Sequence, residues 1–491
     1  MRKKTKIVAT LSDLNCDPQF IKDLYKAGMN VVRLNTAHQS PADTLKIVNN
    51  VREVSDKIAL LLDTKGPEIR TSPNTTKLEV KTGDVVKIGS NPGGSSEDRV
   101  FHVSYPGFVD EVEPGAYILI DDGSVEFHVK SRENGFLICE ALHPGIVKGR
   151  KSVNVPGATF RLPSISEKDR AYIEFAADNE LDFIAHSFVR NKQDVLDVQK
   201  ILDDKNSPVK IIAKIENQEG VDNIDEILEH AYGIMVARGD LAIEIPYEKI
   251  PGIQKMIINK CIERRKPVII ATQMLHSMIT EPRPTRAEVS DVANAIYSKT
   301  DAIMLSGETA YGKYPVQAVK TMARIAKEVE KSRSDMHDTP IVNLSTDISA
   351  YLTRSAVEAS LKLKAKAIIA DTTSGRTIRN MAGYRGRKII YAMCYHIRTV
   401  RLLALSFGVY PEYIPNSHDS MEFVSTSLKK LLKKNKIKNE DKIVVVGGNF
   451  GRKHGASYME ISSAENLCRK LEESPGYSLE GEDEGNTHGC S

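Results

Sequence analysis

The stretch IMVARGDLAIEIP, residues 234–246, places an arginine, a glycine and an aspartate directly after four apolar residues. An unbroken apolar run of this kind is typical of a strand that is buried on both faces of a parallel sheet. Arg238 and Asp240 are therefore expected where the strand leaves the sheet, and not within the core. The stretch predicts a parallel sheet that carries its chemistry at the strand ends.

Seven other apolar runs have the same form and also lead into polar residues. They are TKIVAT (5–10), NVVRLN (30–35), IALLLDT (58–64), LDFIAHS (181–187), KIIAKIE (210–216), PVIIAT (267–272) and DAIMLS (301–306). Most of the gaps between the runs have apolar residues at helical spacing. Eight strands that alternate with helices predict a (β/α)8 TIM barrel.

Two of the predicted helices also carry clear signals at their ends. Asp17 is placed to cap a helix that has Pro18 in its first turn and Gly28 just past its end. Thr285 and Glu288 have the spacing of a capping box. These signals support the helical interpretation of the gaps.

The barrel pattern is interrupted once and then gives way to a different α/β pattern. Alternating strands with glycine and Asn-Gly turns, and no helix, predict an inserted small all-β domain. Strands and helices alternate again near the end of the chain, which predicts a doubly wound α/β domain. We expect the barrel at residues 1–70 and 160–337, the insert at 71–159, the C-terminal domain at 338–470 and a disordered tail at 471–491.

Composition limits the classes of function that this chain of 491 residues can have. Hydrophobic residues make up 41% and charged residues 27% of the chain, which is typical of soluble globular proteins. A net charge of +3 is too small to indicate a nucleic-acid or membrane surface as partner. No run approaches the roughly 18 apolar residues of a membrane span, and the basic N-terminus lacks the apolar core of a signal peptide.

The six cysteines are widely scattered along the chain. They are Cys16, Cys139, Cys261, Cys394, Cys468 and Cys490. Because they form no Cys-x-x-Cys pair, a zinc site is not expected. We expect free thiols and a cytoplasmic location.

Polar residues at the strand ends are the candidate site, because barrel enzymes place their catalytic groups there. Lys214 and Glu216 are two residues apart, so in an extended chain both face the same way. With Asp240 from the next strand, Glu216 could hold Mg²⁺, which favours oxygen ligands, beside a lysine that stabilises negative charge. The other interpretation is a structural network of a lysine and carboxylates at the barrel rim.

Several of these stretches closely resemble pyruvate kinases. The matching segments are GMNVVRLN (28–35), LDTKGPEIRT (62–71), KIENQEG (214–220), IMVARGDLAIEIP (234–246), ATQML (271–275) and TDAIMLSGETAYGKYP (300–315). The resemblance covers about residues 4–465 and includes the β insert. The domain order is also that of the family, with a barrel, a lid-like insert and a regulatory α/β domain.

The resemblance implies transfer of the phosphoryl group of phosphoenolpyruvate to ADP, which gives pyruvate and ATP in the final step of glycolysis. By position, Glu216 and Asp240 resemble the ligands of Mg²⁺ (or Mn²⁺). Lys214 is similar to the lysine that stabilises the transferring phosphoryl group and the enolate. Arg33 resembles a contact to the substrate phosphate, and Thr272 a member of the network that protonates enolpyruvate.

The same resemblance implies the groups that hold the rest of the substrates. Gly239, together with Asp240 and Thr272, resembles the group that binds the substrate carboxylate. On the nucleotide side the implied residues are Asn35, His38, Arg70 and Lys151. A lid with a basic residue such as Lys151 could close over ADP and exclude water. The alternatives are a polar residue at a helix start for His38 and a surface lysine for Lys151.

The expected K⁺ site departs from the family at one position. Asn35, Asp63 and Thr64 match family ligands, and Glu68 matches the glutamate that accompanies K⁺ dependence. Ala37 stands where the family usually has a serine hydroxyl. Because water can replace one neutral ligand, we expect K⁺ to be used, with weaker affinity.

The C-terminal domain has a segment that resembles a sugar-phosphate effector loop. In TTSGRT (372–377), the implied contacts are Thr372, Ser374, Gly375, Arg376 and Thr377. Hydroxyls and glycine N–H groups at a helix start suit a phosphate, but the same residue types also cap helices. The resemblance implies a phosphorylated allosteric effector, which it does not identify, and a homotetramer.

Two other functions remain open on the sequence alone. A Mg²⁺-dependent barrel lyase or aldolase acting on a pyruvate enolate would share Arg33, Glu216 and Asp240 but would need no nucleotide lid. A non-catalytic metabolite-sensing homologue would keep the fold, yet it would be expected to have lost Lys214, Thr272 or one of the carboxylates.

Overall fold

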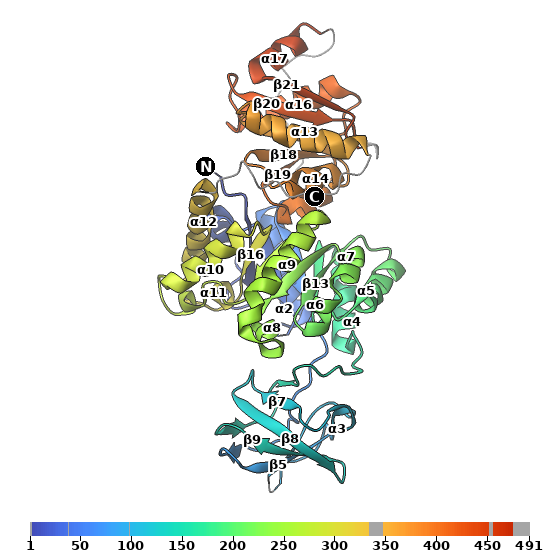
Figure 1. Cartoon of the computed structure of the whole chain (residues 1–491). Coiled ribbons are helices and arrows are strands. Elements are labelled where there is room, and N and C mark those ends of the chain that lie inside the picture. The colour runs from blue at the N-terminus through green and yellow to red at the C-terminus, as the bar shows by residue number, and fades with distance from the viewer. Residues whose placement is uncertain (1, 38, 98, 333–346, 451–454, 475–491) are drawn as a thin grey trace.

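The computed structural model describes residues 2–37, 39–97, 99–332, 347–450 and 455–474. Three bodies follow one another in space, with the barrel between the β insert and the C-terminal α/β domain (Figure 1). The predicted fold class is confirmed. Among the described residues, no helix is both long and apolar enough to cross a membrane.

Eight parallel strands close the barrel, in the order β1-β16-β15-β14-β13-β12-β3-β2. They are β1 (Lys6–Leu11), β2 (Val31–Asn35), β3 (Ala59–Asp63), β12 (Phe183–His186), β13 (Lys210–Ile215), β14 (Gly233–Ala237), β15 (Val268–Ala271) and β16 (Ala302–Leu305). Each overlaps one of the eight predicted runs, and β1 ends one residue after its run, at Leu11. One detail was wrong: Asp240 does not end β14, because Arg238 already begins helix α8 (Arg238–Glu244).

Helices connect the barrel strands and cover them on the outside. They are α1 (Pro18–Ala27), α2 (Pro41–Val54), α4 (Glu167–Asp178), α5 (Lys192–Asp204), α6 (Gln218–Asp222), α7 (Ile224–His230), α9 (Ile250–Glu263), α10 (Arg286–Tyr297), α11 (Gly307–Ala310) and α12 (Pro315–Ser332), with α8. Both predicted helix starts are confirmed. Asp17 accepts a hydrogen bond from the Phe20 amide at 2.9 Å, and Thr285 and Glu288 form the capping box.

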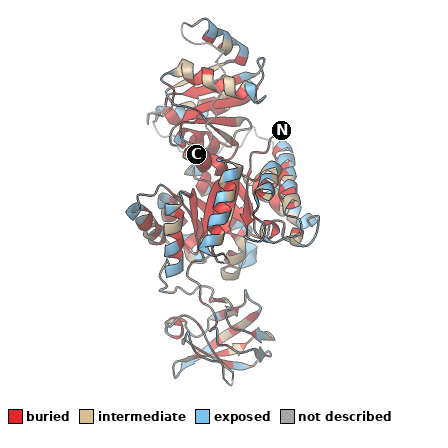
Figure 2. Cartoon of the chain, turned by 180° about the vertical axis from the view of Figure 1, so that it is seen from behind, coloured by how far each residue is buried: buried red, intermediate tan, exposed pale blue. Residues whose placement is uncertain are grey.

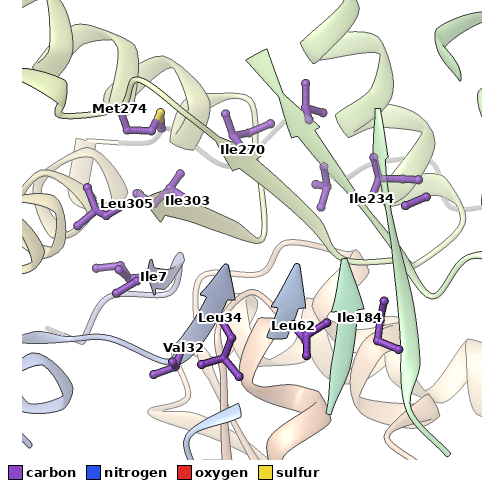
Figure 3. Close-up of a cluster of buried hydrophobic side chains, with 14 of the residues drawn as sticks. Ile7, Val32, Leu34, Leu62, Ile184, Ile234, Ile270, Met274, Ile303 and Leu305 are labelled. Carbon is purple, nitrogen blue, oxygen red and sulfur yellow. The ribbon is translucent and has the colours of Figure 1, made fainter. Parts of the chain in front are cut away.

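Alternate residues of the barrel strands face two apolar layers. Ile7 packs in the outer layer, between strands and helices, whereas Val8 packs inside the barrel. Figure 3 labels outer-layer side chains of several strands, and Figure 2 shows that buried residues concentrate on the sheet. Leu402, Ala404 and Leu405 of the C-terminal domain join the inner layer, so that domain closes the barrel at the end where its strands begin.

The insert contains two sheets, whose strands pair antiparallel except for one parallel pair. Its elements are β4 (Leu78–Val80), β5 (Val85–Gly89), β6 (Val100–His102), α3 (Phe108–Glu111), β7 (Tyr117–Ile120), β8 (Val125–Glu133), β9 (Phe136–Ala141), β10 (Gly145–Val147) and β11 (Val153–Asn154). Asn134 and Gly135, both with positive φ, turn the chain between β8 and β9, as the Asn-Gly signal predicts. The four-residue helix α3 departs from the expectation of an insert without helices.

The C-terminal domain has a five-stranded sheet with helices on both faces. Its elements are α13 (Ile348–Lys362), β17 (Ala367–Thr372), α14 (Arg376–Gly383), β18 (Ile389–Cys394), α15 (Ile397–Leu402), β19 (Val409–Tyr413), α16 (Ser420–Lys433), β20 (Lys442–Gly447), β21 (Tyr458–Ser463) and α17 (Ala464–Glu472). The sheet is parallel except for β21, which pairs antiparallel to β20. Helix α17 enters the segment 471–491 that was expected to be disordered, and the remainder from residue 475 lies outside the described residues.

Two buried ion pairs hold the C-terminal domain against the barrel. Arg385 donates two hydrogen bonds to the Asp301 carboxylate, of 2.7 and 2.5 Å. Arg401 donates to Asp182 at 2.6 Å. In both pairs the arginine comes from the C-terminal domain and the aspartate directly precedes a barrel strand. The interface therefore depends on charges that are buried together.

Removing one partner of such a pair is expected to destabilise the protein strongly. Arg385→Met would leave the Asp301 carboxylate buried without its cation, at a cost of about 3–5 kcal/mol. Denaturant unfolding of the single variant measures this loss. The double variant Arg385→Met with Asp301→Leu is expected to recover much of it, because no unpaired charge remains. Equal destabilisation of the single and double variants would contradict this explanation.

Candidate active site

Four charged side chains alternate in sign at the carboxyl ends of the barrel strands β2, β3 and β13. Arg33 Nε donates to Asp63 Oδ2 at 2.5 Å, and Lys214 Nζ lies 3.0 Å from both Asp63 Oδ1 and Glu216 Oε1. Asp63 and Glu216 are each only 1% exposed. We call Arg33, Asp63, Lys214 and Glu216 the buried charge row. It brings together residues that the sequence predicted at the strand ends.

The buried charge row determines which of its members carry charge. Burial alone would lower the pKa of Lys214, but the carboxylates of Asp63 and Glu216 outweigh it and raise that pKa above its ordinary value. Burial would raise the pKa of Asp63, but Arg33 and Lys214 hold it below its usual range. Lys214 is therefore a fixed ammonium inside the barrel mouth.

Glu216 is the member whose charge is least well compensated. Burial raises the pKa of Glu216 to about 7; Lys214 opposes this rise, while Asp240 and Asp63 add to it. Its other oxygen accepts a hydrogen bond from the Phe188 amide at 2.7 Å. A buried carboxylate that lies near a second carboxylate is stabilised by a further cation.

Glu216 and Asp240 have the oxygen ligands that suit Mg²⁺ or Mn²⁺. Asp240 lies in the first turn of α8, near enough to raise the pKa of both Glu216 and Lys214. Within the described part of the chain, no group of three or more His, Cys, Asp or Glu side chains is arranged to hold a metal ion. Two carboxylates would leave coordination positions for substrate oxygens and water.

Thr272 has a strained backbone beside α8. Its φ of 67° lies in the left-handed region, which is unfavourable for a β-branched residue. Its hydroxyl accepts a hydrogen bond from the Gly239 amide at 2.8 Å and donates to the Ala271 carbonyl at 2.7 Å. The Gly239 amide, expected to bind a substrate carboxylate, thus bonds to Thr272 in this structure. This hydrogen bond therefore holds Thr272 and Gly239 together.

Two residues to which sequence reasoning gave no role also support this site. Ser187 accepts a hydrogen bond from Lys214 Nζ at 2.6 Å and donates to the Thr64 carbonyl at 2.7 Å. Arg238 donates to Asp291 and, at 2.8 Å, to the Thr272 carbonyl. Ser187 could have been found, because it ends one of the predicted strand runs.

The residues expected to bind K⁺ are neighbours at the ends of β2 and β3. Asn35 is the register partner of Asp63, and Thr64 follows directly. Both oxygens of Asp63 already accept contacts from the buried charge row. Asn35 Oδ1 accepts a hydrogen bond from the Ala37 amide at 3.3 Å. These three residues are grouped, and Ala37 brings only backbone atoms and a methyl group to them.

Two of the expected nucleotide residues meet where the insert joins the barrel. The backbone next to Arg70 pairs with that of Lys151, through the Thr71 amide and the Lys151 carbonyl at 2.8 Å. Arg70 contacts Glu68 at 2.7 Å, and Lys151 contacts Asp121 at 2.8 Å. His38 lies outside the described residues.

A cavity of about 290 Å³ separates the insert from the barrel near Glu216. Ile69 and Phe160 line it from the linkers of the insert, and Asn217 and Glu244 line it from the barrel. Asn154 Nδ2 of the insert donates to Glu244 Oε1 at 3.2 Å. This hydrogen bond links the insert to helix α8 of the barrel beside the cavity.

The candidate effector loop forms the start of α14. Gly375 has a φ of 83°, and its amide donates to the Thr372 hydroxyl at 2.9 Å. Thr372 and Thr377 are buried, whereas Ser374 and Arg376 are exposed at the turn. Arg376 reaches to 3.7 Å from Asp347. The five residues are adjacent, but only part of them faces solvent.

Comparison with known proteins gives one consistent result. The family model "Pyruvate kinase, barrel domain" matches residues 2–319, and "Pyruvate kinase, alpha/beta domain" matches residues 351–462. The pyruvate kinase of Borreliella burgdorferi is 50% identical over 472 residues, which cover 95% of this chain and 98% of that protein. The pyruvate kinase of Geobacillus stearothermophilus is 42% identical over 481 residues, which cover 96% of this chain and 82% of that protein.

The fold agrees with a solved structure over nearly the whole chain. The crystal structure of a pyruvate kinase from Cryptosporidium parvum superposes with a TM-score of 0.89 at 36% sequence identity. The superposition covers 94% of this chain and 96% of the other. The similarity therefore includes the barrel, the insert and the C-terminal domain together.

Proposed function

Because the chain belongs to the pyruvate kinase family of phosphotransferases, we propose that it transfers the phosphoryl group of phosphoenolpyruvate to ADP at the buried charge row. The products are pyruvate and ATP, in the final step of glycolysis. The observation that carries the proposal is Lys214, which Asp63 and Glu216 hold as an ammonium at the carboxyl end of β13.

Phosphoryl transfer requires positioning and charge neutralisation more than covalent chemistry by the protein. Arg33 would contact the phosphate of phosphoenolpyruvate, and Lys214 would donate hydrogen bonds to the phosphoryl oxygens and to the enolate oxygen. Glu216 and Asp240 would hold Mg²⁺ or Mn²⁺, which when bound supplies further positive charge to the phosphoryl oxygens. Ser187, bonded to Lys214 at 2.6 Å, fixes the direction of that ammonium.

The second half of the reaction needs a proton on the enolate carbon. We place Thr272 in the network that delivers it, because its hydroxyl is held between the Gly239 amide and a carbonyl. The same unit of Gly239, Asp240 and Thr272 would face the carboxylate of the substrate. The strained backbone of Thr272 is consistent with a functional position.

ADP would bind between the barrel and the lid. We assign its contacts to Asn35, His38, Arg70 and Lys151, since Arg70 and Lys151 meet at the base of the insert. Lid closure would bring these cations to the nucleotide phosphates and exclude water. A lyase or aldolase would need no nucleotide site between the barrel and the lid.

Other parts of the proposal concern regulation and assembly. Residues 372–377 would bind a phosphorylated effector, for which the exposed Ser374 and Arg376 are the available contacts. We also propose a homotetramer in the cytoplasm, with domains at 1–70 and 160–337, 71–159 and 338–470. The free thiols of the described cysteines fit a reducing compartment.

Asn35, Asp63 and Thr64 would hold K⁺ with one ligand fewer than usual, because Ala37 has no hydroxyl. Ala37→Ser is therefore expected to lower the K⁺ concentration for half-activation by roughly threefold to tenfold, as one added polar contact would. Pyruvate formation at increasing KCl, with ionic strength held constant, measures the change. An unchanged K⁺ response in this variant would show that residue 37 does not face the ion.

The proposed function is tested by pyruvate formation from phosphoenolpyruvate with Mg²⁺, with and without ADP. We expect turnover that depends on ADP and yields one ATP per pyruvate. ADP-independent consumption of phosphoenolpyruvate would favour a lyase, and an inactive but folded protein would favour the non-catalytic homologue. Omission of K⁺ in a parallel assay tests the monovalent cation separately.

A further inference from the structure

A buried histidine and a buried serine follow one another at the carboxyl end of β12, and the histidine has no role in the proposed mechanism. His186 is 0% exposed and Ser187 is 2% exposed. Strand β12 pairs with β3 on one side and with β13 on the other. Thr64 directly follows β3, and Lys214 belongs to β13. The two residues therefore lie between an expected K⁺ ligand and the lysine of the buried charge row.

The end of β12 holds every polar group of Thr64. The Thr64 hydroxyl lies 3.3 Å from His186 Nδ1 and accepts a hydrogen bond from the Ser187 amide at 3.1 Å. The Thr64 carbonyl accepts a hydrogen bond from the Ser187 hydroxyl at 2.7 Å. The Thr64 amide donates to the Ala185 carbonyl at 3.0 Å. The position of Thr64 is therefore fixed at its amide, its hydroxyl and its carbonyl.

The surroundings of His186 indicate which ring nitrogen carries the proton. Burial disfavours the charged form of imidazole, so the ring is neutral and has one N–H group. Its Nε2 atom has no hydrogen-bond partner among the described residues, and a buried N–H group without an acceptor is unfavourable. We therefore place the proton on Nδ1, which donates to the Thr64 hydroxyl. That hydroxyl can donate in turn to the Ala185 carbonyl, at 3.4 Å.

Ser187 connects Thr64 to the ammonium group of Lys214. The serine hydroxyl proton points to the Thr64 carbonyl at 2.7 Å, which is nearer than Asp63 Oδ1 at 3.4 Å. Its oxygen lone pairs are then free to accept from Lys214 Nζ, at 2.6 Å. The two carboxylates of the buried charge row lie farther from this nitrogen, at 3.0 Å. The direction of the serine hydroxyl, and with it the contact to Lys214, depends on where Thr64 is held.

We propose that His186 and Ser187 are positioning residues for Lys214 and that they act through Thr64. His186 holds the Thr64 hydroxyl, the Thr64 carbonyl orients the Ser187 hydroxyl, and Ser187 directs the ammonium of Lys214 toward the phosphoryl and enolate oxygens. The inference rests on the proposed phosphoryl transfer, and neither residue has to contact the substrate. Because Thr64 is also an expected K⁺ ligand, the K⁺ position and Lys214 would belong to one hydrogen-bonded chain.

Ser187→Ala tests the contact nearest to Lys214. The variant loses the hydroxyl but keeps the backbone hydrogen bond to Thr64. We expect kcat for pyruvate formation to fall by about 10- to 100-fold, which is the range for residues that orient catalytic groups. The KM for ADP should stay unchanged, because the nucleotide is assigned to the base of the insert. Steady-state assays and a denaturation curve measure both constants and the stability.

Two amide replacements of His186 form a matched pair. In His186→Asn the side-chain amide can take the place of Nδ1 and donate to the Thr64 hydroxyl, whereas in His186→Gln it takes the place of Nε2. We expect the asparagine variant to keep most of kcat and the glutamine variant to lose about tenfold, as for one lost hydrogen bond. Both variants remove the ring, so a purely structural role of the histidine would affect them alike.

Exchange of the methyl protons of pyruvate with deuterium from D₂O is an independent measurement, followed by nuclear magnetic resonance. In this exchange a C–H proton leaves, the enolate forms, and a deuteron from the solvent takes its place. With Mg²⁺ and K⁺ but without ADP, no phosphoryl group is transferred. We expect Ser187→Ala and His186→Gln to slow the exchange by the same factor as pyruvate formation, because Lys214 stabilises the enolate in both. A defect confined to ADP binding would leave the exchange unchanged.

The proposed function and this inference fail in different ways. An unmodified chain that forms no pyruvate overturns both. Normal kcat in a folded Ser187→Ala protein, equal losses in the two His186 variants, or normal exchange in variants that form pyruvate slowly overturns this inference alone. If Ser187→Ala does not fold, the His186 pair and its exchange rates decide the question.

Discussion

Replacing Lys214 by methionine is expected to lower kcat for pyruvate formation by about a thousandfold or more. Methionine keeps the length and apolar stem of the side chain but removes the ammonium that lies 3.0 Å from Asp63 and from Glu216. Removing a single preorganised donor from an active site costs about 10²–10³ in rate, and here a full charge is lost with it. Steady-state assays with saturating Mg²⁺ and ADP measure the loss.

The matched control is Lys210→Met, at the opposite end of the same strand. Lys210 begins β13 and is half-buried, so its replacement changes a lysine of β13 without touching the buried charge row. We expect nearly normal kcat in this control. Circular dichroism and a denaturation curve must show that both variants are folded, because loss of Lys214 leaves Glu216 without its cation. A folded Lys214→Met protein with kcat within tenfold of normal would refute the role of this lysine.

Much of the catalytic domain follows from the sequence because its strands are buried on both faces. Unbroken apolar runs such as residues 58–64 and 301–306 leave no other favourable place for their side chains than a covered parallel sheet. In a parallel barrel, the polar residues that follow each run all lie at the same end, the carboxyl end of the strands. Lys214 and Glu216 were found in this way, and their contact confirms the argument.

The contacts between the barrel and the C-terminal domain could not be predicted in the same way. Lys6 is the second residue of a predicted strand run and looks like an ordinary solvent-facing lysine, yet the C-terminal domain covers it. Asp301 and Arg385 are 84 residues apart in sequence, and no local pattern indicates that they will pair. The packing of two domains depends on the surfaces of both folded domains. The spacing of apolar residues along the sequence does not specify these surfaces.

The candidate site shows the same division between local and long-range information. Asp63 was assigned to K⁺ by resemblance, and its contacts with Arg33 and Lys214 depend on how the strands are ordered around the closed barrel. Asp240 was placed at a strand end, but the chain had already turned into α8. The chemical role of each residue was therefore easier to predict than the residue that it contacts.

Replacing Asp240 by asparagine is the second change with a very large expected effect. The Asp240 carboxylate is close enough to raise the pKa of Glu216, and we expect the two carboxylates to share one divalent cation. Asparagine keeps the shape but removes the negative charge, and with it half of the carboxylate charge available to the metal. We expect kcat to fall by about a thousandfold and the Mg²⁺ concentration for half-activation to rise by at least about tenfold.

The matched control is Glu244→Gln, at the other end of the same helix. Glu244 accepts a hydrogen bond from Asn154 of the lid at 3.2 Å, and burial raises its pKa, so a neutral glutamine is well tolerated there. This variant should keep the normal Mg²⁺ concentration for half-activation, whereas Asp240→Asn should need a higher one. Mn²⁺ binding, followed by electron paramagnetic resonance, reports the metal site independently of turnover. Normal Mn²⁺ affinity in a folded Asp240→Asn protein would show that α8 supplies no metal ligand, and the charge near Glu216 would then need another function.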